Sequence, residues 1–397
     1  MRQTQFIPSA RNVTRHAVAW LVNALQWTTP TRGVDPTLLV RLLVRAAAEM
    51  RSLSAIVADA VGAPSLERVR RAILAQLPSQ APDFLPTASR ALHQNLPAGL
   101  RRRPRVVSID LHLRPYYGRI RTRGIYRGQS KAGTRTFFAY ATALVVQRGQ
   151  TFTLGVTPVV KGQEQTAYLA ELIRQVRAAG VQVRHLLLDR GFYAATTIQW
   201  LQEQSLRFVM PMIRRGRRGR TKATCTGTER FFVKGRRGWD RYTWTTRPRR
   251  ARRRGKPTVV VVTVAVCMAS VPKSPRAKKR KKGPLVYACH GISAPPPQVV
   301  VGYRRRFGIE TSYRQLGEGL AATCSTRAVY RLLLVVIALV LRNLWVWLHW
   351  VHLSEPGGAR GRSRRLRLDR LRLRRLMSWL VVELNRKLRM QTIDSTA

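Results

Sequence analysis

Three acidic residues stand in settings where carboxylates could do chemistry. Asp110 follows the apolar run Val106-Val-Ser-Ile109, Asp189 follows Leu186-Leu-Leu188, and Glu310 lies among arginines and aromatic residues. Hard divalent cations such as Mg²⁺ prefer oxygen ligands and take one or two protein carboxylates each. Three carboxylates can therefore hold two ions, a pair that activates a water or a 3′-hydroxyl for in-line phosphoryl displacement.

The glutamate lies in the most unusual stretch of the chain, Tyr303-Arg-Arg-Arg-Phe-Gly-Ile-Glu-Thr-Ser-Tyr-Arg-Gln-Leu316. Read as one helix, it places Tyr303, Arg306, Glu310 and either Tyr313 or Arg314 on a shared face. One carboxylate held among cations suggests a site for a metal and phosphate together. The alternative is a charged surface helix with an internal ion pair.

Structural explanations also exist for the two aspartates. Asp110 could cap the end of a strand, and Asp189 could form an ion pair with its neighbour Arg190. The chain has no Gly-x-x-x-x-Gly-Lys-Ser/Thr sequence, so ATP binding is not indicated.

The charge of the chain points to a polyanionic partner. It has 73 Lys and Arg against 18 Asp and Glu, a net charge of +55 over 397 residues. Such an excess repels itself unless a polyanion is nearby, so nucleic acid is the expected partner, with an anionic membrane surface as the alternative. The apolar fraction of 45% excludes a disordered basic tail.

The cysteines and the most apolar segment bear on location. The four cysteines stand singly, without a Cys-x-x-Cys pair, which argues against a zinc ribbon or a disulfide framework and fits a reducing, cytoplasmic compartment. The N-terminus lacks the apolar core of a signal peptide. The apolar run 332–341 is about ten residues long, too short for a membrane span, so we expect a buried core helix and no membrane partner.

The first hundred residues are predicted to be helical. Helices are expected over 38–50, 53–60 and, capped by Ser65, to about Leu77. The last two, with a turn at Gly62 and exposed arginines, are compatible with a DNA-binding helix-turn-helix, although any helical hairpin gives a similar pattern. Prolines between 78 and 104 predict a linker.

The apolar period then changes to two, which predicts strands over 106–113, 137–147, 151–160, 181–188 and 208–213. Helices are expected over 164–179, ending at Gly180, and over 194–204. A hairpin turn is expected at 148–150. The order indicates an α/β fold with a mixed sheet and flanking helices, and chemistry collects at strand ends in such sheets.

A β-rich, basic insertion is expected before the glutamate. Its strands are predicted at 231–234, 242–246, 259–268 and 285–289, between basic loops. The expected organisation is a helical N-terminal region (1–100), the first part of a catalytic domain (101–213), the insertion (214–300), the glutamate helix with a Trp-rich core helix (301–353), and a basic C-terminal region (354–397) with a helix over 360–390.

Asp110 on a first strand, Leu-Leu-Leu-Asp189-Arg-Gly-Phe-Tyr and Tyr303-x-x-Arg306-x-x-x-Glu310 together resemble the three motifs of DDE transposases of the insertion-sequence-four type. Within that type the chain is most similar to the ISH-three group. The resemblance covers roughly residues 100–350 and implies an RNase H-like fold with a β insertion before the glutamate.

The resemblance also implies roles for single residues. Asp110, Asp189 and Glu310 would bind two Mg²⁺ ions, with Mn²⁺ as a substitute. Tyr303 and Arg306 would contact DNA phosphate. Arg190 and Arg314 are further candidate DNA-binding residues. The family signature has a lysine seven residues after the glutamate, where this chain has Gly317, so that phosphate contact would fall to Arg314 or Arg327.

Three functions follow from these observations. The first is a cut-and-paste transposase that cleaves double-stranded DNA at the inverted ends of its element and joins them to target DNA, as a homodimer on the nucleoid DNA of a prokaryote. The second is a metal-dependent nuclease of the same fold without strand transfer. The third is a non-catalytic basic nucleic-acid-binding protein, which would not need the three acids.

Overall fold

A mixed β-sheet forms the centre of the computed structural model, which describes residues 8–28, 33–147, 151–219, 224–233, 237–246, 258–272, 280–357, 363–365 and 371–390. Within these residues the sheet has nine strands in the order β2-β3-β1-β5-β6-β9-β8-β7, and β4 also pairs with β3. The strands are β1 (Arg105–Pro115), β2 (Tyr126–Lys131), β3 (Thr134–Val145), β4 (Thr153–Val159), β5 (Val183–Leu188), β6 (Phe208–Pro211), β7 (Gly238–Thr246), β8 (Thr258–Pro272) and β9 (Arg280–His290).

Strand β1 occupies the middle of this sheet. It pairs antiparallel with β3 on one side and parallel with β5 on the other, and β5 pairs parallel with β6. The α/β fold class predicted from the strand order is confirmed. Strand β2 was missed, because its sequence, Tyr-Arg-Gly-Gln-Ser-Lys, is polar and mostly exposed and lacks an alternating apolar pattern. The hairpin turn predicted at 148–150 lies outside the described residues.

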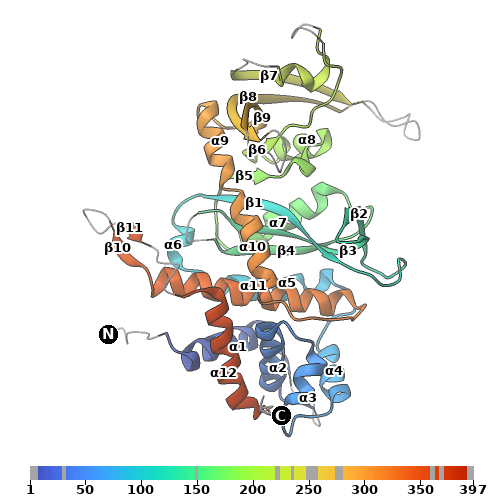
Figure 1. Cartoon of the computed structure of the whole chain (residues 1–397), viewed down its shortest axis with the longest axis vertical. Coiled ribbons are helices and arrows are strands. Elements are labelled where there is room, and N and C mark those ends of the chain that lie inside the picture. The colour runs from blue at the N-terminus through green and yellow to red at the C-terminus, as the bar shows by residue number, and fades with distance from the viewer. Residues whose placement is uncertain are drawn as a thin grey trace.

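The β-rich segment before the glutamate continues the same sheet. Strand β9 pairs with β6, and β8 and β7 follow outward, so these strands extend the sheet to the upper end of the molecule (Figure 1). The strand predicted at 231–234 is wrong: residues 227–231 form the 3-10 helix η3 (Gly227–Phe231), and Lys234 is not described. The basic segments 247–256 and 273–279 also lie outside the described residues.

Helices cover the sheet and form the lower part of the molecule (Figure 1). They are α1 (Ala10–Leu25), α2 (Pro36–Glu49), α3 (Leu53–Asp59), α4 (Leu66–Ala75), α5 (Leu85–His93), α6 (Ala98–Arg101), α7 (Gln165–Ala178), α8 (Ala195–Glu203), α9 (Pro296–Arg304), α10 (Phe307–Gly317), α11 (Ala328–Val351) and α12 (Leu373–Leu388), with short 3-10 turns η1 (Pro82–Phe84) and η2 (Arg190–Phe192). Ser65 caps α4 as predicted, and Gly180 follows α7 with a φ of 73°.

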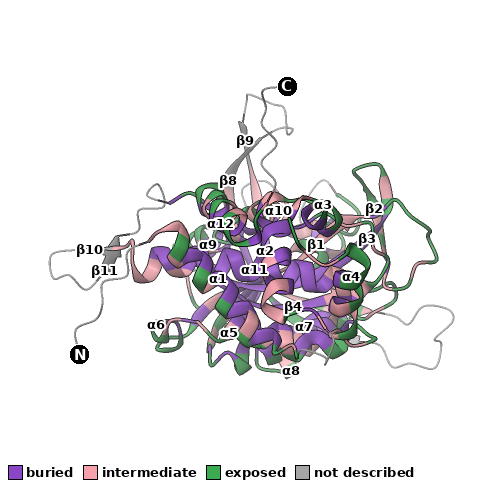
Figure 2. Cartoon of the chain, turned by 90° about the horizontal axis from the view of Figure 1, so that it is seen from below, coloured by how far each residue is buried: buried purple, intermediate pink, exposed green. Residues whose placement is uncertain are grey.

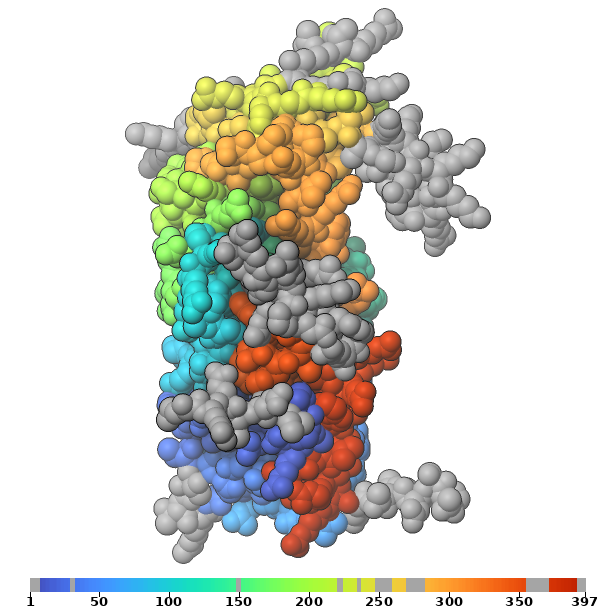
Figure 3. Space-filling model, turned by 90° about the vertical axis from the view of Figure 1, so that its left-hand side faces the viewer, coloured from blue at the N-terminus to red at the C-terminus, as the bar shows by residue number. Residues whose placement is uncertain are grey.

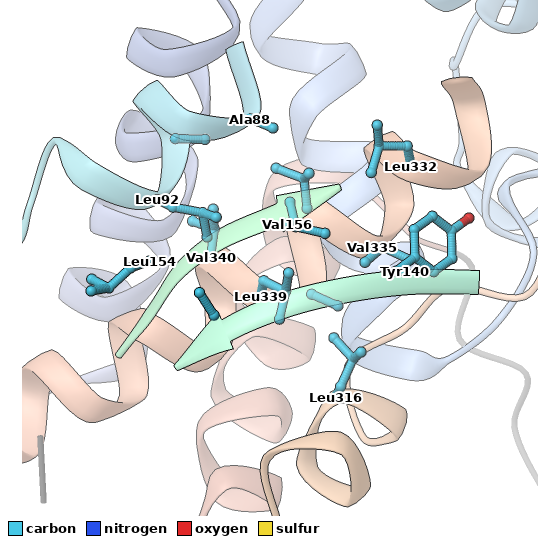
Figure 4. Close-up of a cluster of buried hydrophobic side chains, with 14 of the residues drawn as sticks. Ala88, Leu92, Tyr140, Leu154, Val156, Leu316, Leu332, Val335, Leu339 and Val340 are labelled. Carbon is cyan, nitrogen blue, oxygen red and sulfur yellow. The ribbon is translucent and has the colours of Figure 1, made fainter. Parts of the chain in front are cut away.

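Helix α11 is the core helix of the protein. It lies between the sheet and the N-terminal helices, and it is buried along nearly its whole length (Figures 1 and 2). Its aliphatic side chains pack against β3, β4 and α5, with Leu339 and Val340 beside Leu154 and Val156 (Figure 4). The helix is long and apolar enough to cross a membrane, but 94% of its most apolar window is buried inside the protein.

Polar side chains of α11 fix the neighbouring elements. The guanidinium of Arg342 donates to the carbonyl oxygen of Thr151 at 2.6 Å and to Oε1 of Gln315 on α10 at 3.0 Å. Burial lowers the pKa of Arg342 to about 9, and the hydrogen-bond acceptors of its guanidinium are neutral oxygens. Asn343 exchanges two hydrogen bonds with the backbone of Thr153 on β4. These bonds hold α10, and with it the glutamate, against the core.

Three expectations about connecting segments are wrong. The linker predicted over 78–104 is largely helical, because Pro82 and Pro86 stand in the first turns of η1 and α5, where a missing N–H costs nothing. The single helix predicted over 303–316 is two helices, α9 and α10, joined by a turn with i to i+3 hydrogen bonds at 305–309. The helix predicted over 360–390 is limited to α12, preceded by the small hairpin β10 (Glu355–Gly357) and β11 (Ser363–Arg365).

The C-terminal helix joins the N-terminal helices. Helix α12 packs against α1 and α2, so the two ends of the chain share one helical layer below the sheet (Figure 3). Helices α3 and α4, the predicted helix-turn-helix pair, lie at the surface of this layer, and Arg68, Arg70 and Arg71 of α4 are exposed.

Candidate active site

The two aspartates lie on neighbouring strands in the interior of the sheet. Strands β1 and β5 run parallel, and Ile109 is paired with Leu188 in their register. An aspartate follows each residue of this pair, Asp110 within β1 and Asp189 just after the end of β5, so the two acids come to neighbouring positions at the carboxyl end of β5. Each apolar run before an aspartate buries its strand in the sheet, and the acid follows where the packing opens.

Asp110 is held by three contacts. Its Oδ1 accepts from the N–H of Leu111 at 2.7 Å, its Oδ2 accepts from Nη1 of Arg306 at 3.0 Å, and its carbonyl oxygen accepts from the hydroxyl of Tyr313 at 2.7 Å. Burial raises the pKa of the Asp110 carboxyl to about 6, the Leu111 N–H opposes this rise, and the charge of Asp189 adds to it. A carboxyl with a raised pKa beside a second acid is a typical functional-site arrangement.

Glu310 is brought to Asp110 by one arginine. Arg306 lies one helical turn before Glu310 and donates to its Oε1 from Nη2 at 2.6 Å, while Nη1 holds Asp110. The Arg306 side chain is 9% exposed and the Glu310 side chain 48% exposed. Burial lowers the pKa of the Arg306 guanidinium, but the surrounding negative charges outweigh that effect, so its pKa is raised.

Tyr303 is turned toward the sheet. Its hydroxyl donates to the carbonyl oxygen of Leu188 at 3.0 Å, so it fixes the residue that immediately precedes Asp189. The ring is 7% exposed and packs on Tyr287 with ring centroids 4.9 Å apart. The DNA contact that the resemblance implies for Tyr303 would require its hydroxyl to leave this carbonyl.

Five of the predicted site residues are thus gathered in one place, and two are not. Arg190 and Arg314 are exposed and, within the described part of the chain, make no ion pair with the three acids. The alternative in which Asp189 pairs with Arg190 is therefore not the arrangement in this structure. The alternative of an ion pair within the glutamate helix is present as Arg306–Glu310, but the same guanidinium also reaches Asp110 on another element.

Sequence reasoning missed His112 as part of the site. Its ring packs on Tyr313 with centroids 4.7 Å apart, and burial, with the charges of Arg114 and Lys131, lowers the pKa of His112 to about 3. The hydroxyl of Tyr313 also bonds Thr142 on β3 at 2.8 Å, so this pair fixes α10 over β1. The signal was available: with a period of two, His112 shares the strand face of Asp110.

The three acids fit a divalent cation by donor type. Within the described residues, however, no three His, Cys, Asp or Glu side chains form a closed metal-ligand cluster. The guanidinium of Arg306 lies between Asp110 and Glu310, so a cation already balances these two carboxylates. Glu310 has a half-exposed side chain, so among the three candidate metal ligands it is the one with space to change its orientation. Its only ion pair among the described residues is with Arg306.

Known proteins resemble this chain in sequence pattern and in fold. Residues 101–342 match the family model described as the transposase DDE domain. A solved structure, the cryo-EM structure of a piggyBac transposase synaptic complex with hairpin DNA, is similar with a TM-score of 0.52 and 13% sequence identity, over 100% of this chain and 84% of that chain. This likeness establishes the RNase H-like fold. No curated protein sequence matches the chain significantly.

Proposed function

Since the chain belongs to the transposase DDE domain family and is therefore an enzyme of DNA transposition, we propose that it moves an insertion sequence by a cut-and-paste route. It cleaves double-stranded DNA at the ends of its element and transfers the 3′ ends to target DNA. The observation that carries this proposal is the meeting of Asp110, Asp189 and Glu310, two from neighbouring parallel strands and one from α10.

The proposed catalytic residues are these three acids, which would hold Mg²⁺ or, as a substitute, Mn²⁺. When bound, two such ions activate the attacking hydroxyl or water and stabilise the leaving oxygen. The protein's own residues position the acids: Tyr303 fixes the end of β5, Tyr313 fixes β1, and Arg306 draws Glu310 toward Asp110. For the ions to bind, Arg306 would release Glu310 and turn to a DNA phosphate, the role that its place in the motif implies.

DNA binding would be mainly electrostatic. The net charge of +55 supplies affinity for phosphate without sequence choice, and the exposed arginines of α4 are the candidate sequence reader. Arg190, the residue after Asp189, and Arg314, one helical turn after Glu310, are exposed and are proposed phosphate contacts. Binding should therefore weaken steeply as salt is added, and a salt-independent affinity would contradict this part of the proposal.

The motif Tyr303-x-x-Arg306-x-x-x-Glu310 supports a finer placement in the insertion-sequence-four type, closest to its ISH-three group. From that placement we propose that the enzyme acts as a homodimer on its DNA ends, in the cytoplasm of a prokaryotic cell and on nucleoid DNA.

The decisive experiment uses duplexes that carry the DNA flanking the gene, with labelled strands and a plasmid target. With Mg²⁺ we expect cleavage at one boundary and a joined product, and with a chelator neither. Cleavage without joining would identify the RNase H-like nuclease instead. DNA binding without cleavage, unchanged in Asp110→Ala and Glu310→Ala, would identify a non-catalytic nucleic-acid-binding protein.

A further inference from the structure

A polar cavity lies farther along β1, outside the three-acid site. It has a volume of about 370 Å³ and is lined by the end of β1 and the residues that follow it, by β3, by α11 and by the loop that joins α10 to α11. Its polar lining includes two arginines, Arg114 and Arg331, and the tyrosines Tyr116 and Tyr117 after β1 and Tyr140 on β3. No acidic side chain contributes to it.

Arg114 brings a positive charge into this cavity without a counter-charge. It is half-buried, and within the described part of the chain it makes no ion pair or hydrogen bond through its side chain. Burial lowers the pKa of its guanidinium, which reports the cost of holding the charge there. Buried charges are normally paired, so an uncompensated one facing a cavity points to an anionic ligand.

Arg331 on α11 brings a second charge to the cavity. Its guanidinium lies 4.4 Å from the ring centroid of Phe138 and donates to two backbone carbonyls, those of Thr323 and Ser325. These hydrogen bonds fix the Arg331 guanidinium in place but supply no negative charge. Burial lowers the pKa of Arg331, as it does that of Arg114. Tyr140, at the edge of the core beside Val335 (Figure 4), is buried, and its hydroxyl makes no hydrogen bond within the described residues.

We propose that this cavity binds a phosphate group, with Arg114 and Arg331 as the charge partners and Tyr140 as a hydroxyl donor. Guanidinium groups donate charge-assisted hydrogen bonds to phosphate oxygens, and a hydroxyl group can donate one more. The phosphate belongs either to the backbone of bound DNA or to a free phosphate ion. The assignment of the phosphate to DNA rests on the proposed function, whereas the binding of phosphate by the cavity does not.

The position of the cavity favours backbone DNA phosphate. Arg114 lies four residues beyond Asp110 on the same face of β1, which corresponds to about 13 Å at the rise of an extended strand. That length spans about four base pairs of duplex at about 3.4 Å each. A phosphate held there would fix the register of the DNA relative to the three acids.

Cys324 offers a direct reporter of occupancy, because it lines the cavity and is exposed. In the full-length Cys267→Ser protein, whose cysteines 225 and 289 are buried, the rate of Cys324 alkylation by neutral iodoacetamide is measured. One arm adds sodium phosphate against sodium chloride at equal ionic strength, and the other adds a mixed-sequence DNA duplex. Arg114→Gln is compared with Arg119→Gln, an equal charge change at an exposed residue outside the cavity.

We expect occupancy to slow alkylation, and Arg114→Gln to raise the concentration needed by about tenfold, the usual loss for one charge-assisted hydrogen bond. Arg114→Lys should restore part of the effect and Arg119→Gln should change little. Protection by the duplex alone assigns the site to DNA backbone, and equal protection by sodium phosphate assigns it to free phosphate.

The proposal is overturned if neither ligand slows alkylation, or if the duplex protects Cys324 equally in all three variants, since DNA would then merely cover the thiol from outside. Equal melting temperatures of the variants exclude misfolding as the cause. Because the phosphate arm needs no cleavage, a protein that fails to cut DNA can still pass this test, and an active transposase can fail it.

Discussion

Replacing Asp110 by asparagine should stabilise the metal-free protein at neutral and alkaline pH. Burial, opposed by the Leu111 N–H and reinforced by Asp189, raises the pKa of the Asp110 carboxyl from 3.8 to about 6. The folded state therefore binds this proton more tightly than the unfolded state, so stability is lost as the pH rises through 6. The full loss is about 3 kcal/mol at about 1.4 kcal/mol per pKa unit.

Asparagine removes this cost while keeping the shape of the side chain and one acceptor oxygen, which serves one of the two donors, the Leu111 N–H or the Arg306 guanidinium. With an unfolding entropy of about 2.1 cal/mol/K per residue, or about 0.8 kcal/mol/K for the chain, the gain at pH 8 is about 4 °C in Tm. At pH 5 the unfolded carboxyl is ionised and the folded one is mostly protonated, so the gain falls to about half.

The assay is thermal unfolding of Asp110→Asn and the unmodified protein at pH 8 and pH 5 in a chelator, with the exposed Glu203→Gln as a control that should change little. Added Mg²⁺ should then raise the Tm of the unmodified protein, since it binds only the folded state, and leave Asp110→Asn unchanged. A lower Tm for Asp110→Asn at pH 8, or a gain that does not shrink at pH 5, would refute this account of the site.

Three further changes test other parts of the structure. Glu310→Gln should abolish DNA cleavage while DNA affinity and Tm stay nearly unchanged, because this half-exposed side chain pairs only with Arg306 among the described residues; cleavage and filter-binding assays check it. Gly317→Lys should raise DNA affinity severalfold at low salt, as expected for one added phosphate contact. The slope of log affinity against log salt concentration should steepen by about one, and Gly317→Gln is the uncharged control. A side chain fits there, since a Cβ at Gly317 would meet no atom within 4 Å. Arg342→Lys should lower the stability by about 2 kcal/mol, read as Tm, because lysine cannot replace the fork that holds Thr151 and Gln315.

The sheet and the position of its acids could be predicted because local pattern determines both. Each strand of the catalytic part that is buried in the sheet has an apolar run, and each of the two aspartates directly follows such a run, where the burial of the chain decreases. Parallel pairing of β1 with β5 then brings Asp110 and Asp189 together without any further signal. The exposed strand β2 lacked that pattern and was missed.

What the sequence could not supply was the set of contacts made between distant elements. That Tyr303 reaches the carbonyl of Leu188, and Tyr313 that of Asp110, depends on the turn between α9 and α10, which has no distinctive sequence. The prolines of 78–104 led to the prediction of a linker. Proline disrupts the interior of a helix but is favoured in its first turn, so the residue type alone fits both a linker and the start of a helix. Only the packing of α5 against α1 and β4 decides between the two.

The charge balance of the site explains why Arg306 lies where it does in the free protein. Three carboxylates meet in a partly buried place, and one guanidinium offsets part of their repulsion by holding Asp110 and Glu310. Divalent cations would over-balance the same acids, and the excess positive charge would then favour both the release of Arg306 and the approach of a phosphate. In the proposed function a single arginine thus serves two states: it holds the acids together without metal, and it is free for DNA once metal has replaced it.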